Sequence, residues 1–165
     1  LFRSILQPAV EKLAKETGHT SAFAVWRDDQ SIFLARENVA DGMHVRAPGV
    51  GTPNIFINPF ALSNIAWQDK HEWHRVYTAA GNKEPFPDYP AAEKRLKQIR
   101  KVDVEVCHEK KGITRIVAPV FTGKNGSYAG TIGISFYRQN KITPESKRCR
   151  HVVLRSAQNL TLLLE

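Results

Sequence analysis

"GITRIVAPVFTGKNGSYAGTIGISFYR", residues 112–138, contains two apolar segments separated by a short polar turn. Both segments are rich in β-branched and aromatic residues, which favour strands. The connecting TGKNG includes Asn125 and Gly126, two residue types that tolerate the positive φ angles of a tight hairpin turn. The stretch therefore predicts a β-hairpin with strands over 113–121 and 128–138.

Strict alternation along a strand sorts the side chains of this hairpin onto two faces. One face is entirely apolar and is expected to be buried beneath helices: Ile116, Ala118, Val120, Ile132, Ile134 and Phe136. The other face mixes a cation, apolar groups and small residues: Arg115, Val117, Pro119, Phe121, Thr131, Gly133 and Ser135. Because small residues leave volume that a protein interior must fill, this second face predicts either a ligand pocket or a closely packed helix.

Helical and strand patterns surround the hairpin. A helix is expected over 1–17 with Gly18 beyond its end, and another from Pro144 to the C-terminus, with Thr143 as its N-cap. A third should start at Asn58 and Pro59 and continue through 69–81, before a loop and a basic helix. The expected ranges are 19–27, 31–37, 42–47 and 102–106 for strands, and 91–101 for the basic helix.

This order of elements indicates one domain over residues 1–165 with an α+β fold. We expect a mainly antiparallel sheet. The amphipathic first and last helices should pack side by side on one face, and the helix near Asn58 should cover the other. The arrangement is typical of small-molecule sensor domains.

The net charge of +8, from 24 Lys and Arg against 16 Asp and Glu, suits anionic ligands or acidic partners. The basic residues are interleaved with acids and apolar positions, as in EKRLKQIRK and ESKRCRH, which favours solvated faces over a nucleic-acid footprint. Only two cysteines, Cys107 and Cys149, are present, so a reducing cytoplasm is the simpler location. No apolar run is long enough to span a membrane.

The histidines and cysteines do not form a recognised catalytic or metal motif. His71 and His74 are three residues apart, but they lack the H-E-x-x-H spacing and an obvious third ligand, so an exposed helix face is expected. Cys107 and His108 should point to opposite faces of a strand, and Cys149 should act as a small core side chain. A small hydrolase or transferase that uses these groups is an alternative, but we expect no catalytic residues, cofactor or metal.

On the small-residue face of the hairpin, Thr131 and Ser135 would offer hydroxyl groups and Arg115 a planar cation suited to a carboxylate. The free amide groups at the helix start near Asn58 would add a second surface for an anion. The alternative is that the helix packs tightly here and Arg115 pairs with an acid such as Glu105. The residues alone leave both interpretations open.

Two long segments, LFRSILQPAVEKLAKETGHTSAFAV and GITRIVAPVFTGKNGSYAGTIGIS, resemble the C-terminal effector-binding domain of IclR-type (isocitrate lyase regulator) bacterial transcription factors. The resemblance extends over the whole chain. Glu16, Thr17 and Gly18 match that family's first motif, and Arg46 and Pro53 loosely match its second. The third motif corresponds to Gly112, Ile116, Ala118, Pro119, Val120 and Phe121.

The resemblance implies a GAF-like fold that binds small organic acids or aromatic metabolites and assembles into dimers or tetramers. It also implies that a separate N-terminal winged helix-turn-helix domain, absent from this chain, binds operator DNA. No catalysis is implied. The family's pocket cysteine corresponds to Arg115, its two serines to Gly133 and Ser135, and its acidic residue to Glu105. The family's small helix start corresponds to Asn58, Pro59, Phe60 and Ala61.

The bulk of Arg115, Pro59 and Phe60 argues against the family's smallest effectors, such as glyoxylate. The hypothesis is therefore a cytoplasmic, oligomeric domain that senses a small, anionic effector and regulates transcription. A degenerate sensor with a self-filled pocket, acting only in oligomerisation, is the alternative. The predicted effector-binding residues are Arg115, Ser135, Gly133, Thr131, Glu105, Asn58, Phe60 and Val117.

Overall fold

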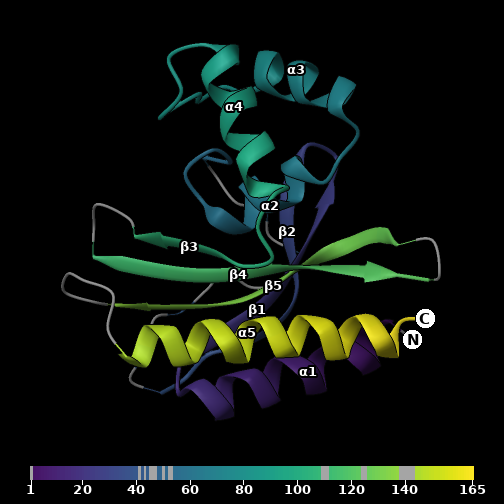
Figure 1. Cartoon of the computed structure of the whole chain (residues 1–165), viewed down its shortest axis with the longest axis vertical. Helices are drawn as coiled ribbons and strands as arrows, with labels where there is room; N and C mark the ends of the chain where they lie inside the picture. Colours follow the sequence, from purple (N-terminus) through teal and green to yellow (C-terminus); the bar gives the residue numbers. More distant parts are fainter. Residues whose placement is uncertain are drawn as a thin grey trace.

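The computed structural model describes residues 2–40, 42, 44, 48–49, 51, 54–108, 112–123, 126–137 and 144–165. It has an α+β architecture in which helices cover both faces of one sheet (Figure 1). The helices are α1 (Phe2–Thr17), α2 (Pro59–Ala66), α3 (Lys70–Ala79), α4 (Tyr89–Ile99) and α5 (Pro144–Leu163). The strands are β1 (Thr20–Arg27), β2 (Gln30–Glu37), β3 (Glu105–His108), β4 (Ile113–Thr122) and β5 (Ser127–Tyr137).

The five-stranded sheet has the order β2-β1-β5-β4-β3, and every neighbouring pair is antiparallel. The predicted hairpin is confirmed as β4 and β5, with Ile116 opposite Ile134 and Val117 opposite Gly133. A second hairpin joins β1 to β2 through Asp28 and Asp29, both with positive φ, as in the tight turns that match the twist of paired strands.

Helices α1 and α5 lie side by side against one face of the sheet, as expected (Figure 1). The core between them and the sheet contains every residue predicted for the apolar face of the hairpin. Leu6, Leu13 and Leu160 enter this core from the helices and are at most 1% exposed. Gly18 follows α1 with φ +72°, which confirms the predicted C-terminal cap.

The opposite face of the sheet is covered by α2, and α3 and α4 form a further layer beyond it (Figure 1). All eight residues of α2 are buried, because the helix is enclosed between the sheet and this outer layer. Trp73 of α3 links the outer layer to α2, because its indole Nε1 donates a hydrogen bond to the Ile65 carbonyl at 2.9 Å. No helix in the described part of the chain combines the length and hydropathy needed to cross a membrane.

The central helical region differs from the prediction of one continuous helix. The helical hydrogen bonds of α2 end at Trp67 and Gln68. The Trp67 amide donates to the Ser63 carbonyl, and the Gln68 amide donates to the Ile65 carbonyl. A new helix, α3, starts after Asp69, and it folds back so that Trp73 contacts α2.

The strand predicted over 102–106 begins later, at Glu105. The amides of Lys101 and Val102 donate hydrogen bonds to the carbonyl oxygens of Gln98 and Ile99. These residues therefore form turns that continue from α4, and strand pairing starts only after them. Helix α4 itself starts two residues earlier than predicted, at Tyr89, after Asp88 caps the Ala91 amide. The predicted strand over 42–47 lies largely outside the described residues, as do Arg46, Pro53, Asn125 and Thr143.

Replacing Gly133 with alanine should destabilise the domain by about 1–3 kcal/mol, because the new methyl group has no room. An ideal Cβ there would lie 2.4 Å from the Ile116 carbonyl oxygen and 2.7 Å from Val117 Cγ1. Gly81→Ala is the matched control, since no atom lies within 4 Å of its Cβ position, and it should change stability by less than about 0.5 kcal/mol. Urea unfolding of both variants measures the difference; equal midpoints would contradict the prediction.

Candidate functional site

The candidate site lies on the sheet face beneath α2, where the start of this helix meets β4 and β5. Asn58 is the N-cap of α2, and its Oδ1 accepts a hydrogen bond from the Phe60 amide at 2.9 Å. Pro59 follows in the first turn, as predicted. The Asn58 side chain therefore satisfies one of the free amides that the sequence analysis assigned to an anion.

Arg115 is the charged group of this face. Its side chain is almost completely enclosed, at 9% exposure, and Nη1 donates a hydrogen bond to Ser135 Oγ at 3.0 Å. The two residues face each other across the β4–β5 ladder, and Cys107 of β3 lies opposite Arg115 on the other side. A guanidinium so enclosed needs hydrogen-bond acceptors, and a ligand carboxylate is a strong one.

An apolar cluster joins the start of α2 to the sheet face that carries Arg115. Val117 packs with Phe60, Ala22, Ala24 and Phe33, and all five are at most 2% exposed. The Phe60 ring meets Phe33 edge to face, with centroids 5.2 Å apart. Gly133 lets Val117 come close to β5, so part of the volume expected from a small residue is filled by the neighbouring strand.

A buried network of hydrogen bonds occupies the other part of this face. Thr131 Oγ1 donates to Ser63 Oγ at 2.9 Å and lies 2.6 Å from the hydroxyl of Tyr128. That hydroxyl donates to Asn64 Oδ1, and Asn64 Nδ2 donates to Ser31 at 2.8 Å. Burial of the Tyr128 hydroxyl raises its pKa, so it remains a neutral donor. This network of hydrogen bonds links α2 to β2 and β5.

The sequence patterns did not predict four members of this network: Ser31, Ser63, Asn64 and Tyr128. A signal for two of them was present, because Ser63 and Asn64 are adjacent polar residues inside an otherwise apolar helix. Buried polar groups of this kind are expected to be hydrogen-bonded. Tyr128 gave no such signal, since it lies near the hairpin turn in the sequence.

Glu105 has a partner from the outer helical layer. It forms an ion pair with Arg95 of α4, and its side chain is 15% exposed. The structure therefore brings Arg115 to Ser135, and Phe60 and Val117 together beside Gly133, with Thr131 bonded to Ser63. Asn58 instead caps its own helix, and Glu105 forms its ion pair with Arg95.

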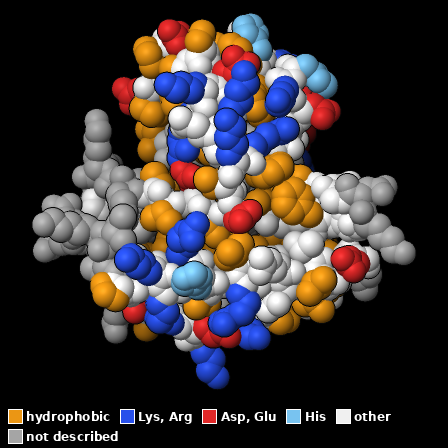
Figure 2. Space-filling view, viewed as in Figure 1, with side chains coloured by type: hydrophobic (Ala, Val, Ile, Leu, Met, Phe, Trp, Pro, Cys, Tyr) orange, Lys and Arg blue, Asp and Glu red, His pale blue; other side chains and the backbone are white. Residues whose placement is uncertain are grey.

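The basic residues expected on solvated faces are visible on the outer layer. Figure 2 shows Lys and Arg side chains over α4, where Lys94 and Lys97 are exposed. Lys97 pairs with Glu93 at 3.3 Å. His71 and His74 are exposed on α3, and the His74 ring packs against Tyr89. These are ordinary contacts of solvated helices.

The fold matches solved structures of bacterial transcriptional regulators over nearly its whole length. IclR of Thermotoga maritima aligns with 99% of this chain at a TM-score of 0.82 and 19% identity, and HmgR of Pseudomonas aeruginosa aligns with 99% at 0.79 and 16%. The chain spans 68% and 67% of those two proteins. The inducer-binding domain of PobR from Acinetobacter, a double mutant in complex with 3-hydroxybenzoic acid, gives a TM-score of 0.77 at 15% identity, with 94% of each chain covered.

The chain has the fold of an IclR-type effector-binding domain. No protein-family model matches the sequence, and no curated protein matches it either. The resemblance noted in the sequence is thus confirmed at the level of the fold. At identities of 15–19%, these matches show the fold alone.

The Tyr128 hydroxyl should contribute measurably to the stability of the IclR-type fold, because its removal leaves Asn64 and Thr131 short of a partner. Tyr128→Phe is expected to lower the free energy of unfolding by about 1–3 kcal/mol. Tyr137→Phe is the control, since this side chain is 67% exposed, and it should have no effect. Guanidinium unfolding followed by circular dichroism compares the two variants. A Tyr128→Phe protein as stable as the control would show that the network contributes nothing.

Proposed function

We propose that this chain is the small-molecule-sensing regulatory domain of a bacterial IclR-type transcriptional regulator. It binds a small organic anion and thereby controls DNA binding by a separate N-terminal domain. The observation that carries the proposal is the enclosed guanidinium of Arg115, which bonds to Ser135 beneath a buried helix on one sheet face. The proposed role is regulatory rather than enzymatic, in a cytoplasmic homodimer or homotetramer.

In the proposed complex, Arg115 exchanges its present acceptors for the oxygens of the effector carboxylate. Ser135 and Thr131 orient the effector by hydrogen bonds, and Phe60 and Val117 supply an apolar wall. The wall suits an aromatic or branched carboxylate, and the PobR domain crystallised with 3-hydroxybenzoic acid is consistent with that class. Gly133, Asn58 and Glu105 remain proposed members of the site, with Glu105 acting through its ion pair with Arg95.

Effector entry requires α2 to shift, because Phe60 and the Thr131–Ser63 hydrogen bond occupy the face that the effector would share. A shift of α2 would move α3 and α4, which pack on it. Binding would thus select one of two arrangements of the outer layer, and through it one arrangement of subunits and DNA-binding domains.

The same contacts favour a second candidate function. Phe60 is fully buried, and Thr131, Ser63, Tyr128, Asn64 and Ser31 satisfy one another. A domain filled in this way could serve only to hold subunits together. The two candidates differ in one respect: only the sensor binds a carboxylate at Arg115.

A thermal-shift panel of hydroxybenzoates, phenylacetates and aliphatic dicarboxylates separates these candidates. At a hundredfold excess over its dissociation constant, an effector stabilises the folded state by about 2.7 kcal/mol, or roughly 5–10 °C in a domain of this size. Arg115→Lys should weaken binding of the active compound by about 10–100-fold, because the planar, bidentate contact is lost. Arg27→Lys, on the exposed end of β1, is the control and should bind normally.

A panel without any shift, in wild type and variants alike, would favour the oligomerisation module. Binding that persists unchanged in Arg115→Lys would place the effector elsewhere. Size-exclusion chromatography with light scattering gives the oligomeric state on which either function depends.

A further inference from the structure

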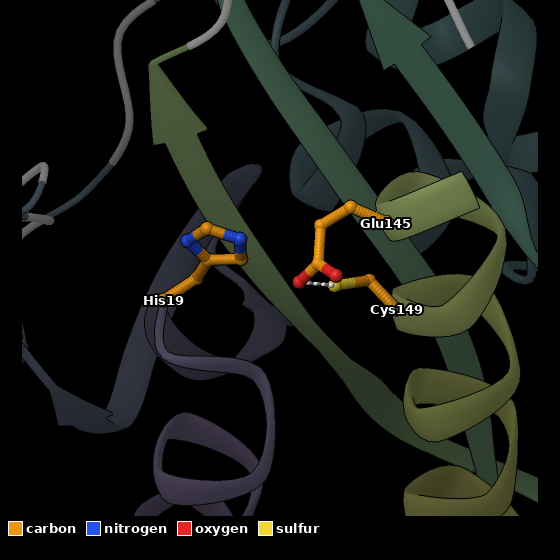
Figure 3. Close-up of side chains that lie close together, drawn as sticks. All are labelled: His19, Glu145 and Cys149. Carbon is orange, nitrogen blue, oxygen red and sulfur yellow. Dashed lines mark hydrogen bonds between the residues drawn. The ribbon is translucent and has the colours of Figure 1, made fainter. Parts of the chain in front are cut away.

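Three side chains with metal-binding atoms converge on the other side of the sheet, where β1 begins and α5 starts (Figure 3). They are His19, Glu145 and Cys149, and one ligand atom of each lies within 4.8 Å of the other two. They come from opposite ends of the chain, so no spacing in the sequence predicts that they lie together. The proposed effector site uses none of these groups, and of the three only Cys149 belongs to the buried core.

His19 presents a nitrogen that nothing in the described structure satisfies. Its ring stacks on Phe136, with centroids 4.1 Å apart and planes at 14°, and this contact holds its orientation. Its Nε2 atom is buried and has no hydrogen-bond partner among the described residues. Figure 3 shows one ring nitrogen facing Glu145 and Cys149. An unsatisfied buried nitrogen is costly, and a metal ion is one group that would satisfy it.

Glu145 and Cys149 are one helical turn apart on α5, and their ligand atoms already have suitable spacing. The Cys149 Sγ lies 3.7 Å from Glu145 Oε1. In a tetrahedral zinc site with Zn–S near 2.3 Å and Zn–O near 2.1 Å, the sulfur and oxygen are separated by about 3.6 Å. The exposed Glu145 side chain can adjust further to close the distance to His19.

We propose that His19, Glu145 and Cys149 bind a single divalent transition-metal ion of the Zn²⁺ class. The donors would be an imidazole nitrogen, a carboxylate oxygen and a thiolate sulfur, a mixture that suits Zn²⁺ and excludes Mg²⁺ and Ca²⁺. On binding, the Cys149 thiol loses its proton to solvent and its sulfur bonds to the metal. The fourth position is left for water or another ligand.

Arg148 is the neighbouring group that opposes a cation here. Its Nη2 donates to Glu145 Oε1 at 2.7 Å and its Nε donates to Oε2 at 3.2 Å, while Nη1 donates to the Glu16 carbonyl at 3.0 Å. The bound metal must share the Glu145 carboxylate with this guanidinium. Removing the positive charge of Arg148 should therefore strengthen binding, which a role of this cluster in packing alone would not predict.

Titration of the purified chain with Zn²⁺ alone, by calorimetry, tests the site. We expect one equivalent per chain, and at least a tenfold loss of affinity in His19→Phe, which keeps the ring stacked on Phe136 but lacks nitrogen. Cys149→Ala should lose affinity similarly. Cys107→Ala is the matched control. It removes the second cysteine of the chain, which lies on β3, and it should bind Zn²⁺ normally. Arg148→Gln should bind several-fold more tightly.

Co²⁺ gives a second readout, because a bound thiolate produces an intense charge-transfer band in the near ultraviolet. Wild type, Cys107→Ala and Arg148→Gln should show the band, and Cys149→Ala should not. The proposal is overturned if wild type and Arg148→Gln bind no Zn²⁺ and show no band. It is also overturned if folded His19→Phe, checked by circular dichroism, binds as tightly as wild type.

Discussion

Antiparallel pairing of β4 with β5 positions nearly every group of interest in this molecule. With Ile116 opposite Ile134, one face of the ladder is entirely apolar and is buried beneath α1 and α5. The other face then carries Arg115, Thr131, Gly133 and Ser135 beneath α2. A slip by one residue would exchange the two faces and bury the guanidinium in the apolar core. The hydrophobic pattern therefore specifies the register and, with it, the location of the candidate site.

Helix α2 connects this face to the rest of the protein. It contacts the sheet with Phe60, Ser63 and Asn64, and it carries the carbonyl groups that Trp73 and Arg100 bind from the outer layer. A fully buried helix with polar contacts on one side and packed helices on the other cannot move alone. Any effector that displaces it must repack α3 and α4, which is how a small ligand could produce a large rearrangement.

The two proposed sites both contact β5, from opposite faces of the sheet. Ser135 faces Arg115, whereas the next residue, Phe136, supports the His19 ring. Thr20, which follows His19, pairs with Ser135 across the β1–β5 ladder. A metal ion at His19 would therefore stiffen the same strand positions that hold Ser135. This adjacency offers a short physical route by which one ligand could affect the other.

The sequence by itself determined the local and periodic features. Alternation predicted the hairpin and both its faces, helical periods predicted α1 and α5, and the Asn58–Pro59 pair predicted the start of α2. The resemblance to IclR-type domains implied a GAF-like fold. Each of these depends on neighbours within a turn or a strand, where residue type limits the conformation directly.

Only the tertiary structure decided which partners the polar groups take. Glu105 could pair with any nearby cation, and only the fold brings Arg95 of α4 to it. Tyr128 bonds to Asn64 although 64 residues separate them, and His19 lies near Cys149 although the two come from opposite ends of the chain. Such contacts depend on the packing of distant elements and leave no periodic trace in the chain. The sequence therefore predicted the main helices and strands, whereas the partners of the polar side chains on the two faces of the sheet were decided only by the tertiary structure.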